Sequence, residues 1–338
     1  MKNIMIWFYN IINFAKRENL DKLFLLLVLM IGITTVIYPI FEPNVTMLNA
    51  LWWSIVTLTT VGYGDISPTT IGGRIVGMFI MFFGIGMLGM FTATIASIFV
   101  ERKQKRERGM ESYNFEKHII LCQWNHRARN TLSLLRKDHR VGNTPIILIA
   151  NLELKPVDDE NLFFIQGEFT EENFKRAGIE KASTVIILGD DRLDPNARDA
   201  GVVLTTLTVE SLNRDVYTIV ELVNSANIPH CERANVNEVI VSSEFSSKLL
   251  SRAALDHGIS KVISELLTSS IGSDLFKIPV PDSMCGYSFI DLFTEMKRFH
   301  NSITLGVQKG NDGDVVSNPP VDFRVESGDF LIIIANDG

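Results

Sequence analysis

Two long apolar stretches stand out in the first hundred residues. Residues 23–41 and 75–100 carry no charged side chain, and each approaches or exceeds the roughly 20 apolar residues with which a helix crosses a bilayer. Between them, residues 48–59 are apolar and compatible with a helix, but too few to cross. Such a segment is tolerated at membrane depth only where protein or a water-filled cavity satisfies its backbone. The pattern predicts an α-helical membrane domain of two spanning helices and a re-entrant half-helix.

The pattern changes completely after the charged segment 101–108. Short continuous apolar runs, typical of buried parallel strands, now alternate with helical segments. The runs lie at residues 118–122, 145–150, 163–165, 184–188, 217–220 and 239–241. Two of the helices have clear start signals, at Thr170 and at Asp194 followed by Pro195. The alternation predicts an α/β Rossmann-like sheet, followed by a helical pair at 247–257 and 260–270 and a small β-rich lobe.

These changes of pattern define the predicted domains. An N-terminal segment precedes the first span, and its apolar residues 4–14 suit a helix in the membrane interface or, about equally, one packed on protein. The predicted boundaries are 1–19 for this segment, 20–100 for the membrane domain, 101–114 for a linker, 115–242 for the Rossmann-like lobe, 243–272 for a helical crossover and 273–338 for the C-terminal lobe.

Basic residues flank both spans on the same side. Lys16, Arg17 and Lys22 precede the first span, and five basic residues between positions 102 and 108 follow the second. The positive-inside rule then places both termini in the cytoplasm, in a multi-pass protein of the cell's inner membrane. The three cysteines are far apart and odd in number, which fits a reducing compartment. A net charge of −7 offers no basic face for nucleic acid.

The most informative motif lies between the two spans. Thr60, Val61, Gly62, Tyr63 and Gly64 follow the half-helix directly, and this TVGYG segment is the selectivity filter of potassium channels, in which backbone carbonyls replace the hydration shell of the ion. Carbonyls face one axis only if some residues adopt backbone angles forbidden to ordinary side chains, which explains the alternating glycines.

Residues 20–100 closely resemble the two-helix potassium channels on the basis of this motif and its flanking helices. The resemblance implies a homotetramer in the lipid bilayer with K⁺ as the permeant ion, because one filter loop supplies only one wall. It also implies a gating hinge at Gly84, about which the inner helix bends. Close helix packing is the alternative for Gly84, since small residues are common at contacts between membrane helices.

The cytoplasmic part resembles a regulator of potassium conductance (RCK) domain over about residues 115–338. The phrases FIQGE at residues 164–168 and VDFRVESGD at 321–329 carry the match. The resemblance implies that RCK domains pair through the helical crossover into an eight-membered gating ring that pulls on the inner helices. One domain per chain supplies four members in a tetramer. The others would come from a second domain, from a separate soluble copy, or not at all.

Two ligands are candidates for such a ring. NAD or another nucleotide would need glycines after the first strand, yet the fingerprint positions hold Gln123, Asn125 and Ala128, and Asn151 replaces the ribose-binding acid. These side chains argue against a pyrophosphate at this turn and leave a vestigial nucleotide fold as the alternative.

Calcium is the second candidate, because it prefers several oxygen ligands. Asp190, Asp191 and Asp194 follow the fourth strand and Glu221 ends the fifth, at the place where calcium-gated relatives carry carboxylates. The second acid expected after Glu221 is Val223, so the match is partial. A helix N-terminus rich in acids is the simpler explanation of the aspartates.

Three classes of function remain to be weighed. An oxidoreductase needs an intact nucleotide turn and catalytic residues, and the sequence contains neither, so we do not expect an enzyme. A regulatory subunit of a separate transporter would lack a filter of its own. A potassium channel gated by a ligand-sensing cytoplasmic ring uses every segment, and a channel with a vestigial, ligand-free RCK domain is the alternative.

Overall fold

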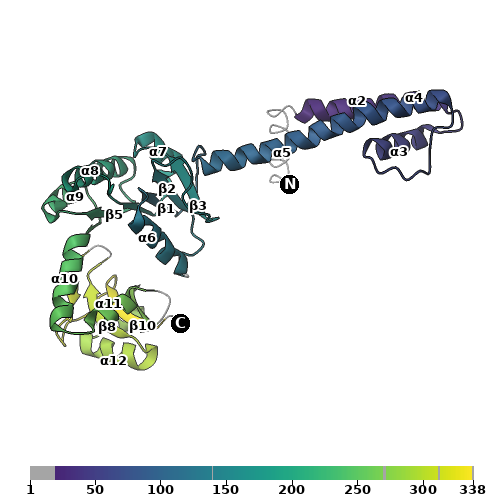
Figure 1. Cartoon of the computed structure of the whole chain (residues 1–338). Coiled ribbons are helices and arrows are strands. Elements are labelled where there is room, and N and C mark those ends of the chain that lie inside the picture. Colours follow the sequence, from purple (N-terminus) through teal and green to yellow (C-terminus); the bar gives the residue numbers. More distant parts are fainter. Residues whose placement is uncertain (1–19, 139, 269–271, 311–312, 337–338) are drawn as a thin grey trace. The chain divides into compact units, whose positions relative to one another are not determined.

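The computed structural model describes residues 20–138, 140–268, 272–310 and 313–336. The chain divides into two compact units, Met1–Lys105 and Arg106–Gly338 (Figure 1). The expected interfacial segment 1–19 lies outside the described residues.

The described part of the first unit is helical. Its elements are α2 (Leu20–Phe41), α3 (Met47–Leu58), α4 (Ile71–Phe79), the π-helical turn η1 (Ile80–Gly84) and α5 (Ile85–Glu107). Helix α2 and the continuous helix Ile71–Glu107 are both long and apolar enough to cross a membrane. Helix α3 is apolar but shorter, so the predicted pattern of two spans and one half-helix is confirmed.

Contacts at the C-terminal end of α2 position the loop between α3 and α4. The ring of Tyr38 stacks on that of Trp53 with centroids 3.8 Å apart, and both side chains are buried. The Glu42 carboxylate accepts the backbone N–H groups of Thr69 and Thr70 at 2.6 and 2.7 Å. The loop that carries the TVGYG segment is therefore anchored where it enters α4.

A six-stranded parallel sheet forms the centre of the second unit. Its strands are β1 (Ile119–Cys122), β2 (Ile146–Ala150), β3 (Leu162–Gln166), β4 (Thr184–Ile187), β5 (Tyr217–Leu222) and β6 (Glu238–Val241), in the order β3-β2-β1-β4-β5-β6. All six predicted strands are confirmed, and so is the Rossmann-like order. Because the strands are parallel, their carboxyl ends meet at one edge, where ligands bind in folds of this kind.

Helices on the two faces of the sheet make two separate cores. They are α6 (His126–Lys137), α7 (Glu171–Arg176), α8 (Pro195–Leu212) and α9 (Ile228–Arg233). On one face, Ala128 and Leu132 of α6 pack against the strand side chains that point to that face. On the other face, Phe174, Val202 and Cys231 of α7, α8 and α9 cover the alternate strand side chains, which point the opposite way. Strands buried on both faces explain the uninterrupted apolar runs.

The crossover and the C-terminal lobe follow the sheet. The crossover helices are α10 (Ser242–Leu255) and α11 (Ile259–Leu266), and the lobe contains β7 (Ser273–Pro279), α12 (Phe289–His300), β8 (Ile303–Gln308), β9 (Val315–Ser317) and β10 (Phe330–Asn336). Its four strands form a sheet in the order β7-β10-β8-β9, with antiparallel pairs. The predicted β-rich lobe is confirmed, although the pattern did not predict α12.

The predicted linker 101–114 has two structurally different halves. Its first half continues α5 as far as Glu107 with mostly exposed charged side chains. Its second half is bound to the sheet domain, since the Gly109 carbonyl accepts the backbone N–H of Gln166 at 3.2 Å and a side-chain N–H of Arg176 at 2.7 Å. Only the first half is therefore a solvated connection.

Candidate functional site

The TVGYG segment leaves α3 in an unusual backbone conformation. Thr60, Gly62 and Gly64 have φ of 61°, 57° and 76°, in the left-handed region, whereas the two residues between them do not. This alternation is the geometry that the glycine spacing predicts for a row of carbonyls facing one side. A threonine at positive φ costs roughly 1–3 kcal/mol, and strain of this kind clusters at functional sites.

Trp52 braces this segment from α3. Its ring stacks on Tyr63 with centroids 5.8 Å apart and planes 2° apart, and its Nε1–H donates to Asp65 Oδ2 at 2.8 Å. Trp53, the next residue of α3, instead stacks on Tyr38 of α2. The loop is thus held by one tryptophan, and the other joins the two helices.

Gly84 lies where the inner helix changes its hydrogen-bond pattern. The π-helical turn Ile80–Gly84 ends at this residue and the α-helix resumes at Ile85. A Cβ on Gly84 would lie 2.4 Å from Leu58 Cδ1, whereas Gly86 and Gly89 have no such neighbour within 4 Å. The geometry satisfies the packing explanation of Gly84, and the hinge stays a prediction.

The turn after β1 is already filled by side chains. Gln123 has a glycine-like φ of 77°, but its side chain is buried in the turn. Asn125 caps α6, because its Oδ1 accepts the backbone N–H of Ala128 at 2.9 Å while its Nδ2 donates to the Gly189 carbonyl at 3.1 Å. A pyrophosphate would lie at this helix N-terminus, so a dinucleotide in that position does not fit the residues present.

A cavity of about 280 Å³ lies beside this turn, at the carboxyl edge of the sheet. Asn151 lines it and donates its side-chain amide to Glu168 Oε1 at 2.8 Å. An acid therefore does stand next to Asn151, but it comes from the segment after β3. Arg192 and Arg198 line the same cavity together with the acids Asp190 and Glu168, so the lining carries charges of both signs. Sequence reasoning missed the role of Glu168, whose only signal was its place at the end of the FIQGE phrase.

The four acids predicted to hold calcium have other partners. Asp190 pairs with Arg192 at 2.6 Å, and this hydrogen-bonded pair keeps the pKa of Asp190 below its usual value. Asp194 caps α8 by accepting backbone N–H groups of Asn196 and Ala197. The helix-terminus explanation of Asp194 is therefore confirmed.

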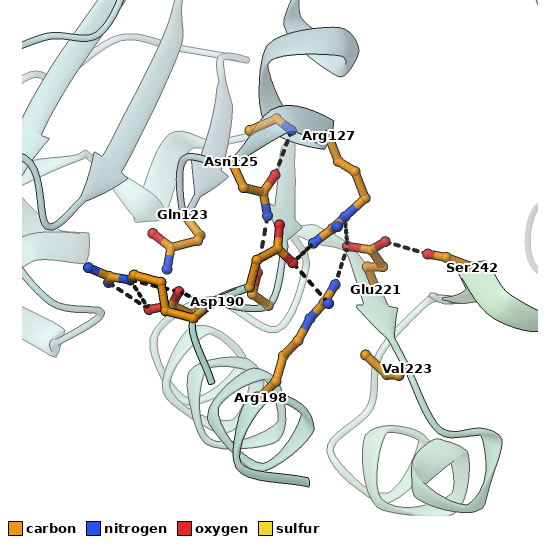
Figure 2. A network of polar contacts seen from close by, with 12 residues as sticks. Gln123, Asn125, Arg127, Asp190, Arg198, Glu221, Val223 and Ser242 are labelled. Carbon is orange, nitrogen blue, oxygen red and sulfur yellow. Dashed lines mark hydrogen bonds and ion pairs between the residues drawn. The ribbon is translucent and has the colours of Figure 1, made fainter. Parts of the chain in front are cut away.

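Asp191 and Glu221 are bridged by two arginines, Arg127 and Arg198 (Figure 2). Arg127 reaches Asp191 at 2.6 Å and Glu221 at 2.7 Å, and Arg198 reaches the same acids at 2.9 and 3.2 Å. Burial acts to lower the pKa of Arg127, yet its hydrogen bonds to the two acids outweigh this and raise it. Within the described residues no group of three or more acids, histidines or cysteines has the geometry of a metal site. The residues present do not fit calcium.

Comparison with known proteins identifies the two units. A family model described as an ion channel matches residues 20–101, and one described as the calcium-activated potassium channel slowpoke-like RCK domain matches residues 114–220. The putative potassium channel protein YugO of Bacillus subtilis is 31% identical over 320 residues, which cover 91% of this chain and 93% of the relative. The chain belongs to the prokaryotic potassium channels with an RCK domain. It is a channel protein of the membrane and not an enzyme.

Other relatives of this potassium channel family agree. The calcium-gated potassium channel TvoK of Thermoplasma volcanium is 28% identical over 332 residues, covering 94% of this chain and 92% of the relative. Among solved structures, the GsuK channel has a TM-score of 0.51 at 16% identity over 94% of this chain and 56% of its own. The human SLO3 gating ring has a TM-score of 0.52 at 16% identity over 65% of this chain and 44% of its own. The chain spans about half the length of these structures, which at this identity show the fold alone.

Proposed function

We propose that the chain is the subunit of a homotetrameric, K⁺-selective channel of the inner membrane, with both termini in the cytoplasm and a cytoplasmic RCK ring that senses an intracellular ligand. The single observation that supports selectivity is the backbone of residues 60–64, whose left-handed residues alternate with ordinary ones. Four such loops around one axis supply rings of carbonyl oxygens that replace the hydration shell of K⁺. The basic residues around the two spans support the topology.

Pairing of the RCK domains is supported by apolar side chains of the crossover. Helices α10 and α11 have no buried residue in the isolated chain. Phe245, Leu250, Leu255 and Val262 are more than half exposed, and an apolar surface of this kind marks an interaction site. Helix-to-helix pairing of RCK domains covers these side chains and builds the gating ring.

The proposed ligand site is the cavity beside β1, β2 and β4. Its volume of about 280 Å³ lies just below the roughly 300–1,000 Å³ typical of ligand pockets. It would hold one nucleoside-sized polar group and not a whole dinucleotide. Gln123 and Asn151 would orient such a group, and Arg192 would face an anionic substituent. Calcium, favoured by the name of TvoK, is the second candidate, and the arginines at Asp191 and Glu221 oppose it.

Ligand binding would act on the gate by preferring one geometry of the ring, since a ligand shifts an equilibrium only through its different affinities for two states. The change would pass through the segment 109–114, which is bound to β3 and α7, into α5 and the inner helix.

Flux assays on the purified full chain in liposomes test this proposal. We expect K⁺ to pass and Na⁺ to be excluded, and K⁺ flux to change when ADP or ATP is titrated on the cytoplasmic side, whereas NAD, which the cavity would not hold whole, should have no effect. Asn151→Ala should abolish that change and leave selectivity intact. Equal passage of Na⁺ and K⁺ would contradict the filter, whereas K⁺-selective flux that ignores every ligand would contradict only the sensor.

A further inference from the structure

The acids Asp191 and Glu221 and the arginines Arg127 and Arg198 form a closed group of four charges. Each arginine contacts both acids, with four nitrogen–oxygen distances between 2.6 and 3.2 Å (Figure 2). The side chains of Glu221 and Arg198 are only 7% and 13% exposed. The Arg198–Glu221 pair is therefore screened far less by salt than surface pairs, whereas Arg127 and Asp191 are 33% and 41% exposed. The two positive charges already balance the two negative ones.

A divalent cation would have to displace both guanidinium groups from this cluster. Each arginine would then keep a charge in a partly buried position without its partners, which is strongly unfavourable. Because the displaced guanidinium groups would remain beside the site on α6 and α8, the ion would add its positive charge to a cluster that is already neutral. The cluster thus has nothing to gain from the ion.

The oxygen ligands that calcium requires are also committed elsewhere. Calcium takes roughly six to eight oxygens, but the second oxygen of Glu221 accepts a hydrogen bond from the Ser242 hydroxyl. Val223 offers no side-chain oxygen, and its backbone N–H donates to Asp199 Oδ1 at 2.9 Å. While the arginines are in place, neither of the two positions at the end of β5 therefore leaves a free carboxylate oxygen. Without the arginines, Glu221 Oε2 and Asp191 Oδ1 would be free to bind an ion, with water completing its coordination.

We propose that Arg127 and Arg198 are built-in counter-cations that exclude calcium from the carboxyl edge of this RCK domain. They are specificity-determining residues: they take the place of a regulatory divalent ion, so calcium does not control the channel through Asp191 and Glu221. The inference rests on the proposed function, in which this edge of the sheet communicates with the gate.

Thermal unfolding of the purified full chain in detergent tests calcium binding without reference to ion flux. Calcium at about 1 mM exceeds the dissociation constants of about 10⁻⁷–10⁻⁵ M found for calcium sensors. We expect no calcium-dependent change of Tm in the wild type. The double variant Arg127→Gln/Arg198→Gln frees both carboxylates, and calcium should raise its Tm by about 3 °C or more.

Matched variants make the result specific. Arg129→Gln changes an arginine of the same helix α6, whose exposed guanidinium lies 5.9 Å from the centroid of the Trp124 ring and outside the four-charge group, and it should behave like the wild type. A wild-type calcium shift that Glu221→Gln abolishes would overturn the proposal. A wild-type shift that survives Glu221→Gln would place calcium elsewhere and uphold the exclusion at this site.

Two further outcomes keep the test decisive. If the double variant does not fold, Arg198→Gln alone should give a smaller calcium-dependent rise of Tm, because Arg127 still contacts both acids but only one counter-charge remains. The absence of any rise in a folded single variant would count against the proposal. Because binding is read as Tm, a channel that fails to select K⁺ in liposomes would contradict the proposed function and leave this result standing.

Discussion

Trp52 makes two contacts with the filter that one substitution separates. Trp52→Phe keeps an aromatic ring against Tyr63 but removes the Nε1–H that donates to Asp65. The lost hydrogen bond is worth about 1 kcal/mol in a half-exposed position. We expect a lower ratio of K⁺ to Na⁺ flux in liposomes, because the filter loop loses one of its lateral supports.

Trp53→Phe is the control for this experiment. Trp53 is the next residue of α3, and its ring stacks on Tyr38 rather than on the loop. A phenylalanine there preserves ring stacking and should leave the flux ratio unchanged. Equal effects of the two substitutions would show that Trp52 acts through α3 in general and not through Asp65.

Substitution of Gly84 tests whether the residue is needed for helix packing. Gly84→Ala would place a Cβ 2.4 Å from Leu58 Cδ1 and 3.2 Å from Met30 Cε, and overpacking of this kind costs about 1–3 kcal/mol. We expect a lower Tm for the full chain. Gly89→Ala has open space around the new methyl group and should leave Tm equal or slightly higher.

A second substitution separates the two roles of Gly84. If packing explains the residue, Leu58→Ala should remove the clash, so that the double variant is more stable than the sum of the single effects predicts. Additive effects on Tm, together with reduced K⁺ flux in Gly84→Ala, would instead favour the hinge.

His118 links the stability of the cytoplasmic unit to pH. The imidazole is fully buried, and its Nε2–H donates to the Ala177 carbonyl at 2.9 Å. Burial lowers the pKa of His118 in the folded state, so the unfolded chain binds a proton first. Stability is therefore complete above the unfolded pKa of about 6.5 and falls as the pH drops below it. Chemical denaturation at several pH values should show this loss, and His118→Gln should weaken it.

The role of a single residue could be predicted from the sequence where it depends only on the local backbone conformation. The glycines of the filter and the cap at Asp194 follow from rules that involve neighbours in the sequence. Arg127 and Arg198 were not predictable in this way, because their partner Glu221 lies 94 and 23 residues away along the chain. Carboxylates that resemble a metal site thus cannot be distinguished from carboxylates in ion pairs until the fold is known.

At the scale of elements, the segment after α5 is the most informative. One guanidinium nitrogen of Arg176 in α7 donates hydrogen bonds to the carbonyls of Gly109 and Glu111, at 2.7 and 3.0 Å. Arg176→Ala should release this segment from the sheet domain. We expect faster amide hydrogen exchange at residues 109–113 and a smaller effect of ligand on K⁺ flux, with K⁺ selectivity unchanged.

Lys175→Ala provides the matched control on the same helix. Lys175 is exposed, and its ammonium group pairs with Glu171 one turn earlier, at 3.5 Å. It should leave both the exchange rates and the ligand response as in the wild type. A normal ligand response in Arg176→Ala would show that the signal bypasses residues 109–113.

The strands and spans were predicted well because burial on both faces leaves continuous apolar runs. The binding of the second half of the linker to the sheet domain was not predicted. The charged composition of residues 101–108 gives no indication that the residues after them contact β3 and α7. Gly109 illustrates the reason: its φ of 64° and the approach of Gln166, whose nitrogen would lie 2.3 Å from a Cβ, are set by a strand more than 50 residues later in the chain.

At the scale of the whole molecule, we expect assembly to cover the apolar side chains of α10 that are exposed in the single chain. Leu250 and Leu255 of α10 are 72% and 75% exposed. In the proposed ring they lie in the interface between RCK domains, where a charge would be buried without a partner. Leu250→Glu should therefore weaken pairing while the pore still holds the tetramer together. Amides of α10 and α11 should exchange faster, and K⁺ flux should become independent of ligand.

The position of the substituted leucine makes this prediction specific to the interface. Leu154 is 56% exposed in the loop after β2, so Leu154→Glu adds the same charge at a comparably exposed site outside the crossover. It should leave exchange at α10 and α11 unchanged. If Leu250→Glu and Leu154→Glu behave alike, the exposed leucines of α10 do not pair RCK domains. The ring would then have to assemble through another surface, and the link between crossover and gate would be lost with it.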